Sequence, residues 1–145
     1  MDTALDLLRG KSLSLVTARP DMTVLEAAEL MNRHGIGSVL VLDDEGLAGI
    51  FTERDVLRRV VGRSLPPAAT LLRDVMSTDV LCCVADAAID DVAELMRSRR
   101  VRHLPVVDAA GDVIGLVSIG DVNAHRFATC EVALQQVQEY VLRRA

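Results

Sequence analysis

The chain has 145 residues, half of them apolar, and a formal net charge of −5 at pH 7. This length suits one domain with a single core, and without a run of about 18 apolar residues no membrane span is expected. The negative charge and the lack of a long basic cluster argue against nucleic acid as a partner. The N-terminus lacks the pattern of a signal peptide, so we expect a cytoplasmic protein. An odd number of cysteines, with Cys82 next to Cys83, argues against a disulfide framework.

The first predicted elements lie between residues 13 and 61. An apolar strand at Leu13–Thr17 should lead through a turn into a helix that begins with a capping box, Thr23 with Glu26. This helix has one apolar face and should end near Gly35. A hairpin and a second helix should follow, as the strands Val39–Leu42 and Leu47–Phe51 and a helix from Thr52 or Glu53 to about Val61.

The same order of elements recurs in the second half of the chain. Ala28-Glu29-Leu30-Met31 reappears 65 positions later as Ala93-Glu94-Leu95-Met96. Such self-similarity indicates two like structural units. The second unit should contain a strand at Val80–Val84, a helix with Ile89 and Met96 on one face, strands at Val101–Val107 and Val113–Val117, and a helix from Ser118. Pro105 predicts an edge strand or an irregular strand.

These patterns predict one module with four parts. The first repeat should cover residues 12–62, and a linker marked by Pro66-Pro67 should cover 63–73. The second repeat should cover 74–125, and a C-terminal helix 126–145. The apolar residues of this last helix alternate three and four positions apart, as in a coiled coil: Phe127, Cys130, Leu134, Val137 and Val141. This face could pack on the chain's own body or contact a second subunit.

A doubled pattern of hydroxyl and carboxylate is the strongest sign of a site. Thr52 and Asp55 follow a glycine-led apolar strand in the first repeat, and Ser118 and Asp121 do so in the second. The start of a helix favours phosphate, a hydroxyl can donate to an oxygen, and a carboxylate can accept from a ribose diol. The same spacing is also a capping box, so a purely structural role stays open.

These residues, the Ala-Glu-Leu-Met helix and the segment from Arg102 to Asp108 resemble a tandem pair of CBS domains, often called a Bateman module. The resemblance covers about residues 12–125 and is greatest to small stand-alone bacterial CBS-pair proteins. It implies an α+β fold of two β-α-β-β-α repeats, packed through their sheets with pseudo-two-fold symmetry, plus a C-terminal helix. It also implies regulatory binding of AMP, ADP, ATP, NAD(H) or S-adenosylmethionine in clefts between the repeats, usually in a homodimer, without catalysis.

The resemblance also assigns roles to individual residues. Asp55 and Asp121 match ribose-binding carboxylates, and Thr52 and Ser118 match the hydroxyls near ribose or phosphate. Thr17 and Cys82 match positions that face adenine, and Arg99 and Arg100 match positions that reach a phosphate, with His34 and Gly35 as their counterparts in the first repeat. Two segments match the lining of the base pocket: Ile36-Gly37-Ser38 and Val101-Arg102-His103. The sequence leaves open which cleft receives the arginines.

Three further points stay open at this level. Arg54 could contact phosphate or be a solvated helix residue, and His103 could be structural or contact a ligand. No metal site is expected, because His34 and His125 lack the spacing of metal ligands. The alternative functions are a thiol or other small-ligand sensor and a protein-interaction module without nucleotide, and the effector protein is unknown.

Overall fold

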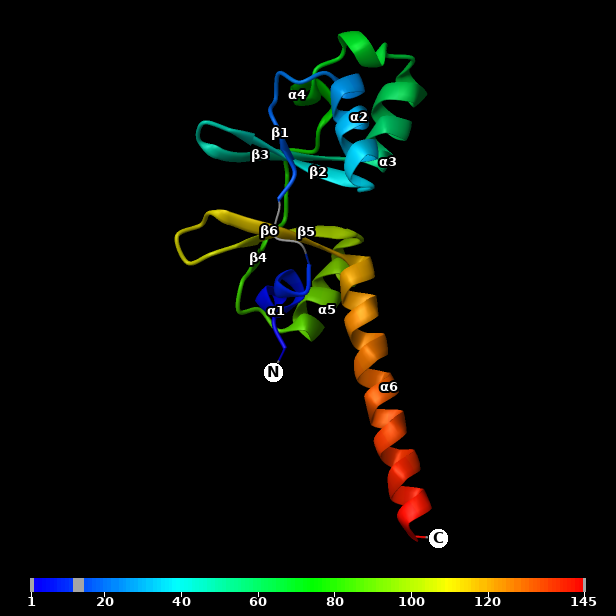
Figure 1. The fold of residues 1–145 in the computed structure, drawn as a ribbon. Helices are drawn as coiled ribbons and strands as arrows, with labels where there is room; N and C mark the ends of the chain where they lie inside the picture. The colour runs from blue at the N-terminus through cyan, green and yellow to red at the C-terminus, as the bar shows by residue number, and fades with distance from the viewer. Residues whose placement is uncertain (1, 12–14, 145) are drawn as a thin grey trace.

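The computed structural model describes residues 2–11 and 15–144. It contains two repeats, each built on a three-stranded sheet (Figure 1). The first repeat comprises β1 (Thr17–Ala18), α2 (Val24–His34), β2 (Ser38–Asp43), β3 (Gly46–Thr52) and α3 (Glu53–Asp55), which continues as a π-helical turn, η1 (Val56–Val60), and a 3-10 turn, η2 (Val61–Arg63).

The second repeat has the same order of elements. It comprises β4 (Cys83–Val84), α5 (Ile89–Arg99), β5 (His103–Val107), β6 (Val113–Ser118) and α6 (Ile119–Arg144). Between the repeats lie a 3-10 turn, η3 (Pro67–Ala69), and α4 (Leu72–Val75). A further short helix, α1 (Ala4–Arg9), precedes the first repeat.

Both sheets have the same topology, with one parallel and one antiparallel pair. β1 is parallel to β2 and β2 antiparallel to β3, and β4, β5 and β6 repeat this order. Alternate residues of the central strands enter two separate cores, as Val39 and Val41 do in one and Leu104 and Val106 in the other. In Figure 1 the two sheets are neighbours, with α2 and α3 beyond the first and α1 and α5 beyond the second. The predicted α+β fold is confirmed.

The short helix in front of each repeat packs on the other repeat. In α1, the Ala4 N–H donates to the Ala87 carbonyl over 2.9 Å, and Leu7 is buried in the second core. In α4, Leu72 and Val75 are buried in the first core. This exchange ties the repeats together, and it places the segment after α1 beside the second sheet.

The helix ends follow the predicted capping chemistry with one difference between the repeats. The Thr23 hydroxyl accepts the Glu26 N–H at the start of α2, whereas Ala88 leaves the start of α5 without a side-chain cap. Gly35 ends α2 in the left-handed conformation, with φ of 61°. Arg100 takes the same conformation after α5, with φ of 54°, although its side chain makes that conformation unfavourable.

Two predicted strands are longer than the strands in the structure. β4 keeps only Cys83–Val84 of the predicted Val80–Val84, and β5 begins at His103 rather than Val101. Of the predicted strand Leu13–Thr17, residues 13 and 14 lie outside the described residues, and β1 is Thr17–Ala18. In each repeat, the first strand therefore pairs with the central strand over only two residues, at the C-terminal end of the predicted strand.

Pro105 predicted an edge strand or an irregular strand. The edge strand is wrong, because β5 is the central strand of its sheet, but β5 is irregular close to the proline. Pro105 pairs with Leu116 of β6, and the register shift lies after it, between Val106 and Val107. β4 pairs only with Val106 and Val107, so the parallel ladder loses no hydrogen bond at the proline. The shortness of β4 thus explains why a central strand tolerates it.

The last helix, α6, runs without a break for 26 residues and extends away from the two sheets (Figure 1). Its apolar face is open: Phe127 is 70% exposed, Leu134 59% and Val137 60%. The interpretation that this face packs on the chain's own body is therefore wrong, and contact with a second subunit stays a prediction. Over the described part of the chain, no helix is both long and apolar enough to span a membrane.

Candidate functional site

Two pockets lie where the repeats meet. Pocket 1 has a volume of about 450 Å³ and combines the end of α2 and the start of β2 with β6 of the second repeat. The N-terminal segment also contributes to it, through Leu8 and Lys11. Residues from the first repeat include His34, Gly35, Ile36, Gly37 and Ser38, and those from the second include His103, Leu116 and Ser118.

Pocket 2 has a volume of about 540 Å³ and reverses this arrangement. It combines the start of β5 in the second repeat with the end of β3 and the start of α3 in the first. Its lining includes Thr52, Glu53, Arg54, Arg100, Val101, Arg102 and His103, together with Ser118 at the start of α6. The two pockets share Gly37, His103 and Ser118.

Each pocket therefore takes the segment at the start of a central strand from one repeat and a hydroxyl residue at the start of a helix from the other. The sequence left open which cleft receives Arg99 and Arg100. Arg100 lines the same pocket as Arg102, Thr52 and Arg54, whereas Arg99 lines neither pocket. Among the described residues, Arg54, Arg100 and Arg102 have no ion-pair partner. The lining of pocket 2 thus includes three arginines without an ion-pair partner and one acidic residue, Glu53, and this excess of positive charge suits an anion.

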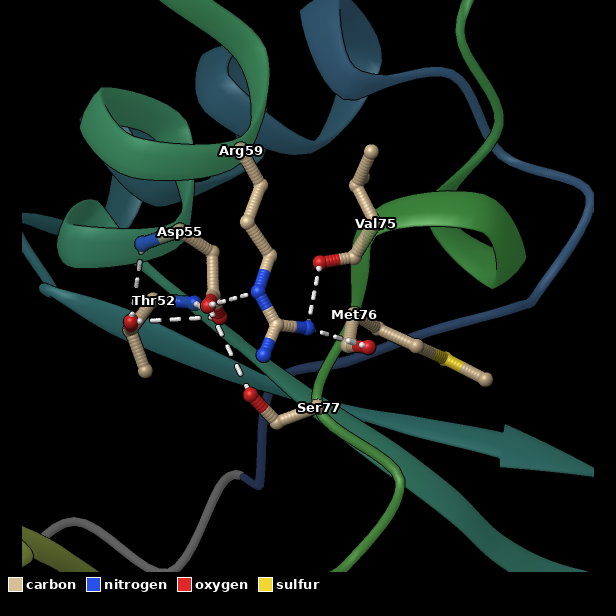
Figure 2. Close-up of polar contacts among 6 residues, drawn as sticks. All are labelled: Thr52, Asp55, Arg59, Val75, Met76 and Ser77. Atoms are coloured by element: carbon tan, nitrogen blue, oxygen red, sulfur yellow. Dashed lines mark hydrogen bonds and ion pairs between the residues drawn. The ribbon is translucent and has the colours of Figure 1, made fainter. Parts of the chain in front are cut away.

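The Thr52–Asp55 pair forms a complete capping box (Figure 2). The Thr52 N–H donates to Asp55 Oδ2 over 3.0 Å, and the Asp55 N–H donates to the Thr52 hydroxyl over 3.3 Å. Asp55 Oδ1 lies 3.6 Å from Arg59 Nε and 3.5 Å from the Ser77 hydroxyl. The Asp55 side chain is only 9% exposed and lines neither pocket. Asp55 therefore caps the start of α3 and links it to Ser77, which follows α4.

Arg59, in the π-helical turn η1, is the cationic partner of Asp55. Its guanidinium donates to the carbonyls of Val75 and Met76, over 3.3 and 3.0 Å (Figure 2). Those carbonyls end α4, so one arginine satisfies both the Asp55 carboxylate and an unpaired helix end. The sequence indicated Asp55 but not Arg59, because the position in the second repeat that matches Arg59 is His125, which pairs with Asp2 rather than with Asp121.

The Ser118–Asp121 pair is also a capping box but has different surroundings. The Ser118 N–H donates to Asp121 Oδ2 over 2.8 Å, and the Asp121 N–H donates to the Ser118 hydroxyl over 3.2 Å. Instead of an arginine of its own helix, Asp121 pairs with Lys11, whose ammonium lies 2.8 Å from Oδ2. The Asp121 side chain is 22% exposed, and both Ser118 and Lys11 line pocket 1. The two carboxylates that looked equivalent in sequence therefore differ in access.

Electrostatics differ around these groups. Burial by itself raises the pKa of Asp121, but the hydrogen bonds from Lys11 and from the Ser118 N–H outweigh it and hold that pKa below its usual range. Burial lowers the pKa of His103, and the nearby Arg102 and Lys11 lower it further. A neutral imidazole in both pockets can donate or accept a hydrogen bond, which suits contact with a base or a hydroxyl.

Some of the predicted site residues lie outside both pockets. Thr17 and Arg99 are exposed and line neither of them, although Leu15 and Val16 before Thr17 line pocket 1. Cys82 is half-buried and also lies outside them, and burial raises its thiol pKa. Their roles in binding stay predictions. The other predicted residues, apart from Asp55 and Asp121, line pocket 1, pocket 2 or both: Ile36, Gly37, Ser38, Thr52, Arg54, Arg100, Val101, Arg102, His103 and Ser118.

Sequence reasoning missed Lys11, which is the single lysine of the chain. Its partner Asp121 is 110 positions away, and the sequence patterns predicted no helix before the first repeat that could have indicated the contact. The described residues contain no group of three or more histidine, cysteine or acidic side chains that could hold a metal ion.

Comparison with known proteins gives a consistent result. The family model for the CBS domain matches residues 11–62 and 72–126. An uncharacterized protein of Methanopyrus kandleri is 36% identical over 130 residues, which are 86% of this chain and 66% of that protein. The chain thus spans slightly less than two thirds of that relative.

Two solved structures show the same similarity. A protein with CBS domains from Burkholderia ambifaria is 36% identical with a TM-score of 0.84, covering 88% of this chain and 95% of that one. The CBS domain pair of protein MJ0100, solved with 5′-methylthioadenosine and S-adenosyl-L-methionine, is 25% identical with a TM-score of 0.73, covering 85% of this chain and 98% of that one.

Proposed function

Because this chain belongs to the CBS domain family and forms a CBS pair, a regulatory ligand-binding module, we propose that it binds an adenosyl ligand in the pockets between its repeats. The observation that carries the proposal is the convergence of Arg54, Arg100 and Arg102 from both repeats on pocket 2. Three unpaired guanidinium groups in one pocket favour a ligand that carries phosphate. AMP, ADP, ATP and NAD(H) all meet this requirement.

The size and the lining of the pockets support a small-molecule ligand. Volumes of about 450 and 540 Å³ lie within the range of about 300–1,000 Å³ that is usual for such sites. The ligands of the MJ0100 pair, 5′-methylthioadenosine and S-adenosyl-L-methionine, are both adenosyl compounds, which supports that class for this chain. For pocket 2 we favour a phosphate-bearing member over S-adenosylmethionine, whose sulfonium would meet the arginines with like charge.

We further propose that the ligand regulates another protein and undergoes no reaction. Both site carboxylates are engaged in capping boxes, and each has a cationic partner. The second subunit of a homodimer would use the open apolar face of α6, whose three-four spacing matches a second copy of itself. Burial raises the pKa of Cys82, and that of Cys83 to about 11, which argues against the alternative of a thiol sensor. The cytoplasmic compartment and the effector stay predictions.

A thermal unfolding panel tests the proposal. A ligand that binds only the folded state at 100 times its Kd stabilises it by about 2.7 kcal/mol. For a chain of this size, each kcal/mol raises Tm by about 2–4 °C. We expect ATP, AMP or NADH to raise Tm more than S-adenosylmethionine, and Arg102→Gln to reduce the shift.

The matched control is Arg63→Gln, which removes an exposed arginine outside both pockets. It should keep the full shift. If none of the four ligands changes Tm at millimolar concentration, the proposal of an adenosyl-binding module is wrong.

A further inference from the structure

Lys11 precedes the first strand of the chain and forms an ion pair with Asp121, a carboxylate of the predicted site. Its ammonium donates to Asp121 Oδ2 over 2.8 Å and to the Leu116 carbonyl over 3.1 Å. Leu116 belongs to β6 and lines pocket 1 together with Lys11. The contact therefore lies on the wall of the pocket.

The position of Lys11 is set by the docking of α1 on the second repeat. The Ala4 and Leu5 N–H groups donate to the carbonyls of Ala87 and Ala85, each over 2.9 Å. Leu8 packs so closely on β6 that a Cβ at Gly115 would lie 2.6 Å from it. Since only Gly10 separates Lys11 from Arg9, the last residue of this anchored helix, the Lys11 side chain reaches Asp121 from a fixed starting point.

The counterpart in the first repeat shows what is particular to Asp121. Asp55 pairs with Arg59 of its own helix, and its side chain is 9% exposed. Asp121 is 22% exposed, and its cationic partner Lys11 is 40% exposed at the pocket wall. A lysine on a flexible stem can change partners without unfolding a helix, whereas Arg59 also holds the end of α4. Asp121 itself lines neither pocket, but it is the more exposed of the two carboxylates, and its partner Lys11 lies on the wall of pocket 1.

We propose that Lys11 is a specificity-determining residue of pocket 1, where it makes phosphate-bearing adenosyl ligands bind better than unphosphorylated ones. This inference rests on the proposed function. A neutral nucleoside that uses Asp121 must separate it from Lys11 and leaves the ammonium without a partner. A phosphate accepts that ammonium, and Asp121 becomes free for the ligand hydroxyls.

The test compares the Kd of AMP and of adenosine for the full chain by isothermal titration. Wild-type protein should bind AMP about tenfold or more tightly than adenosine. With AMP, Lys11 gains a charge-assisted hydrogen bond to the phosphate, whereas with adenosine it loses its bond to Asp121 without a replacement. Lys11→Met should lower this preference about tenfold, because it should weaken the binding of AMP and strengthen the binding of adenosine. Arg9→Met, which removes an exposed charge from the same segment, should leave the preference unchanged.

A second variant assigns the effect to Asp121. In an Asp121→Asn background, Lys11→Met should no longer strengthen adenosine binding, because the competing ion pair is already absent. Lys11→Gln provides the same comparison with a polar side chain should the methionine variant fail to fold. Equal changes for AMP and adenosine, or weaker adenosine binding, would overturn the role of Lys11. If neither AMP nor adenosine binds the wild-type protein, this inference is overturned, and the proposed function is overturned with it only if ATP, NADH and S-adenosylmethionine also fail to bind.

Discussion

Arg100 takes a conformation that a glycine takes in the first repeat. Its φ of 54° corresponds to the φ of 61° at Gly35, and a side chain there costs about 1 kcal/mol or more. Arg100 lines pocket 2 together with Arg54 and Arg102. Backbone strain that is kept at a pocket is a reason to suspect a functional residue.

Arg100→Gly should therefore separate stability from binding. We expect the free energy of unfolding to rise by about 1 kcal/mol, because glycine accepts positive φ, while affinity for ATP falls. Denaturant unfolding and a nucleotide titration measure the two effects. The reciprocal change Gly35→Arg should lower stability by a similar amount. A loss of stability in Arg100→Gly, or unchanged ATP affinity, would contradict this role.

The cysteines differ in their burial, and thiol labelling reports it. Cys83 is buried with its pKa raised to about 11, Cys82 is half-buried, and Cys130 is exposed on α6. Because the thiolate is the reactive form, Cys83 should label slowest at pH 8, and Cys130 should label first in dilute protein, where no second copy covers the face of α6. Timed alkylation followed by mass spectrometry gives the order. Reaction of Cys83 as fast as that of Cys130 would favour the thiol-sensor alternative.

For single residues, the sequence predicts the capping and candidate site residues better than it predicts their ion-pair partners. The spacing of Thr52 with Asp55 and of Ser118 with Asp121 predicts both a capping box and a ligand contact, and the capping boxes are present. The partners that distinguish the two carboxylates, Arg59 and Lys11, come from one repeat only or from outside the duplication. A repeat pattern indicates what the copies share and carries no information on where they differ.

Among the elements, α6 has the clearest unexplained surface. It begins directly after Ser118, which lines both pockets, and continues unbroken to Arg144, with its apolar face open. A ligand that alters the contacts of Asp121 therefore acts on the first turn of the helix that we propose as the subunit contact. Sequence periodicity predicted this helix and its apolar face, but only the structure shows that the body leaves that face uncovered.

A charge on the open face of α6 should weaken dimer formation. Leu134→Glu should raise the dimer Kd about tenfold or more, because a carboxylate would be buried in an apolar contact. The monomer should keep its stability, since Leu134 is exposed within the chain. Light scattering across a concentration series measures the oligomer, and Gln135→Glu on the polar side is the control. A protein that is monomeric before mutation would rule out this contact.

The element boundaries show where local patterns fail. The helices and the β2–β3 and β5–β6 hairpins lie close to their predicted places, because periodicity and turn residues determine them locally. β1 and β4 have only two residues each, and their length depends on pairing with a distant strand. The place of Pro105 in a central strand depends on that same shortness of β4.

For the whole molecule, duplication explains the pockets. Two copies that face each other place the base-lining segment of one next to the hydroxyl of the other, so each pocket needs both repeats. The sequence predicted this exchange only through its resemblance to a family, because periodicity alone does not orient one repeat on the other. The exchange of α1 and α4 between the repeats could not be predicted, since neither helix is part of the repeated pattern.

The central claim is that the arginines of pocket 2 hold the phosphates of an adenosyl ligand. Titration calorimetry of the wild-type protein with ATP should give a measurable Kd and a defined number of sites per chain. A triple variant, Arg54→Gln, Arg100→Gln and Arg102→Gln, should weaken binding at least about tenfold, because charge-assisted hydrogen bonds are lost. A triple variant with the same change in net charge at the exposed Arg58, Arg63 and Arg73, outside both pockets, should bind as the wild type does. Equal weakening in both triple variants, or no binding of ATP by the wild type, would contradict the account.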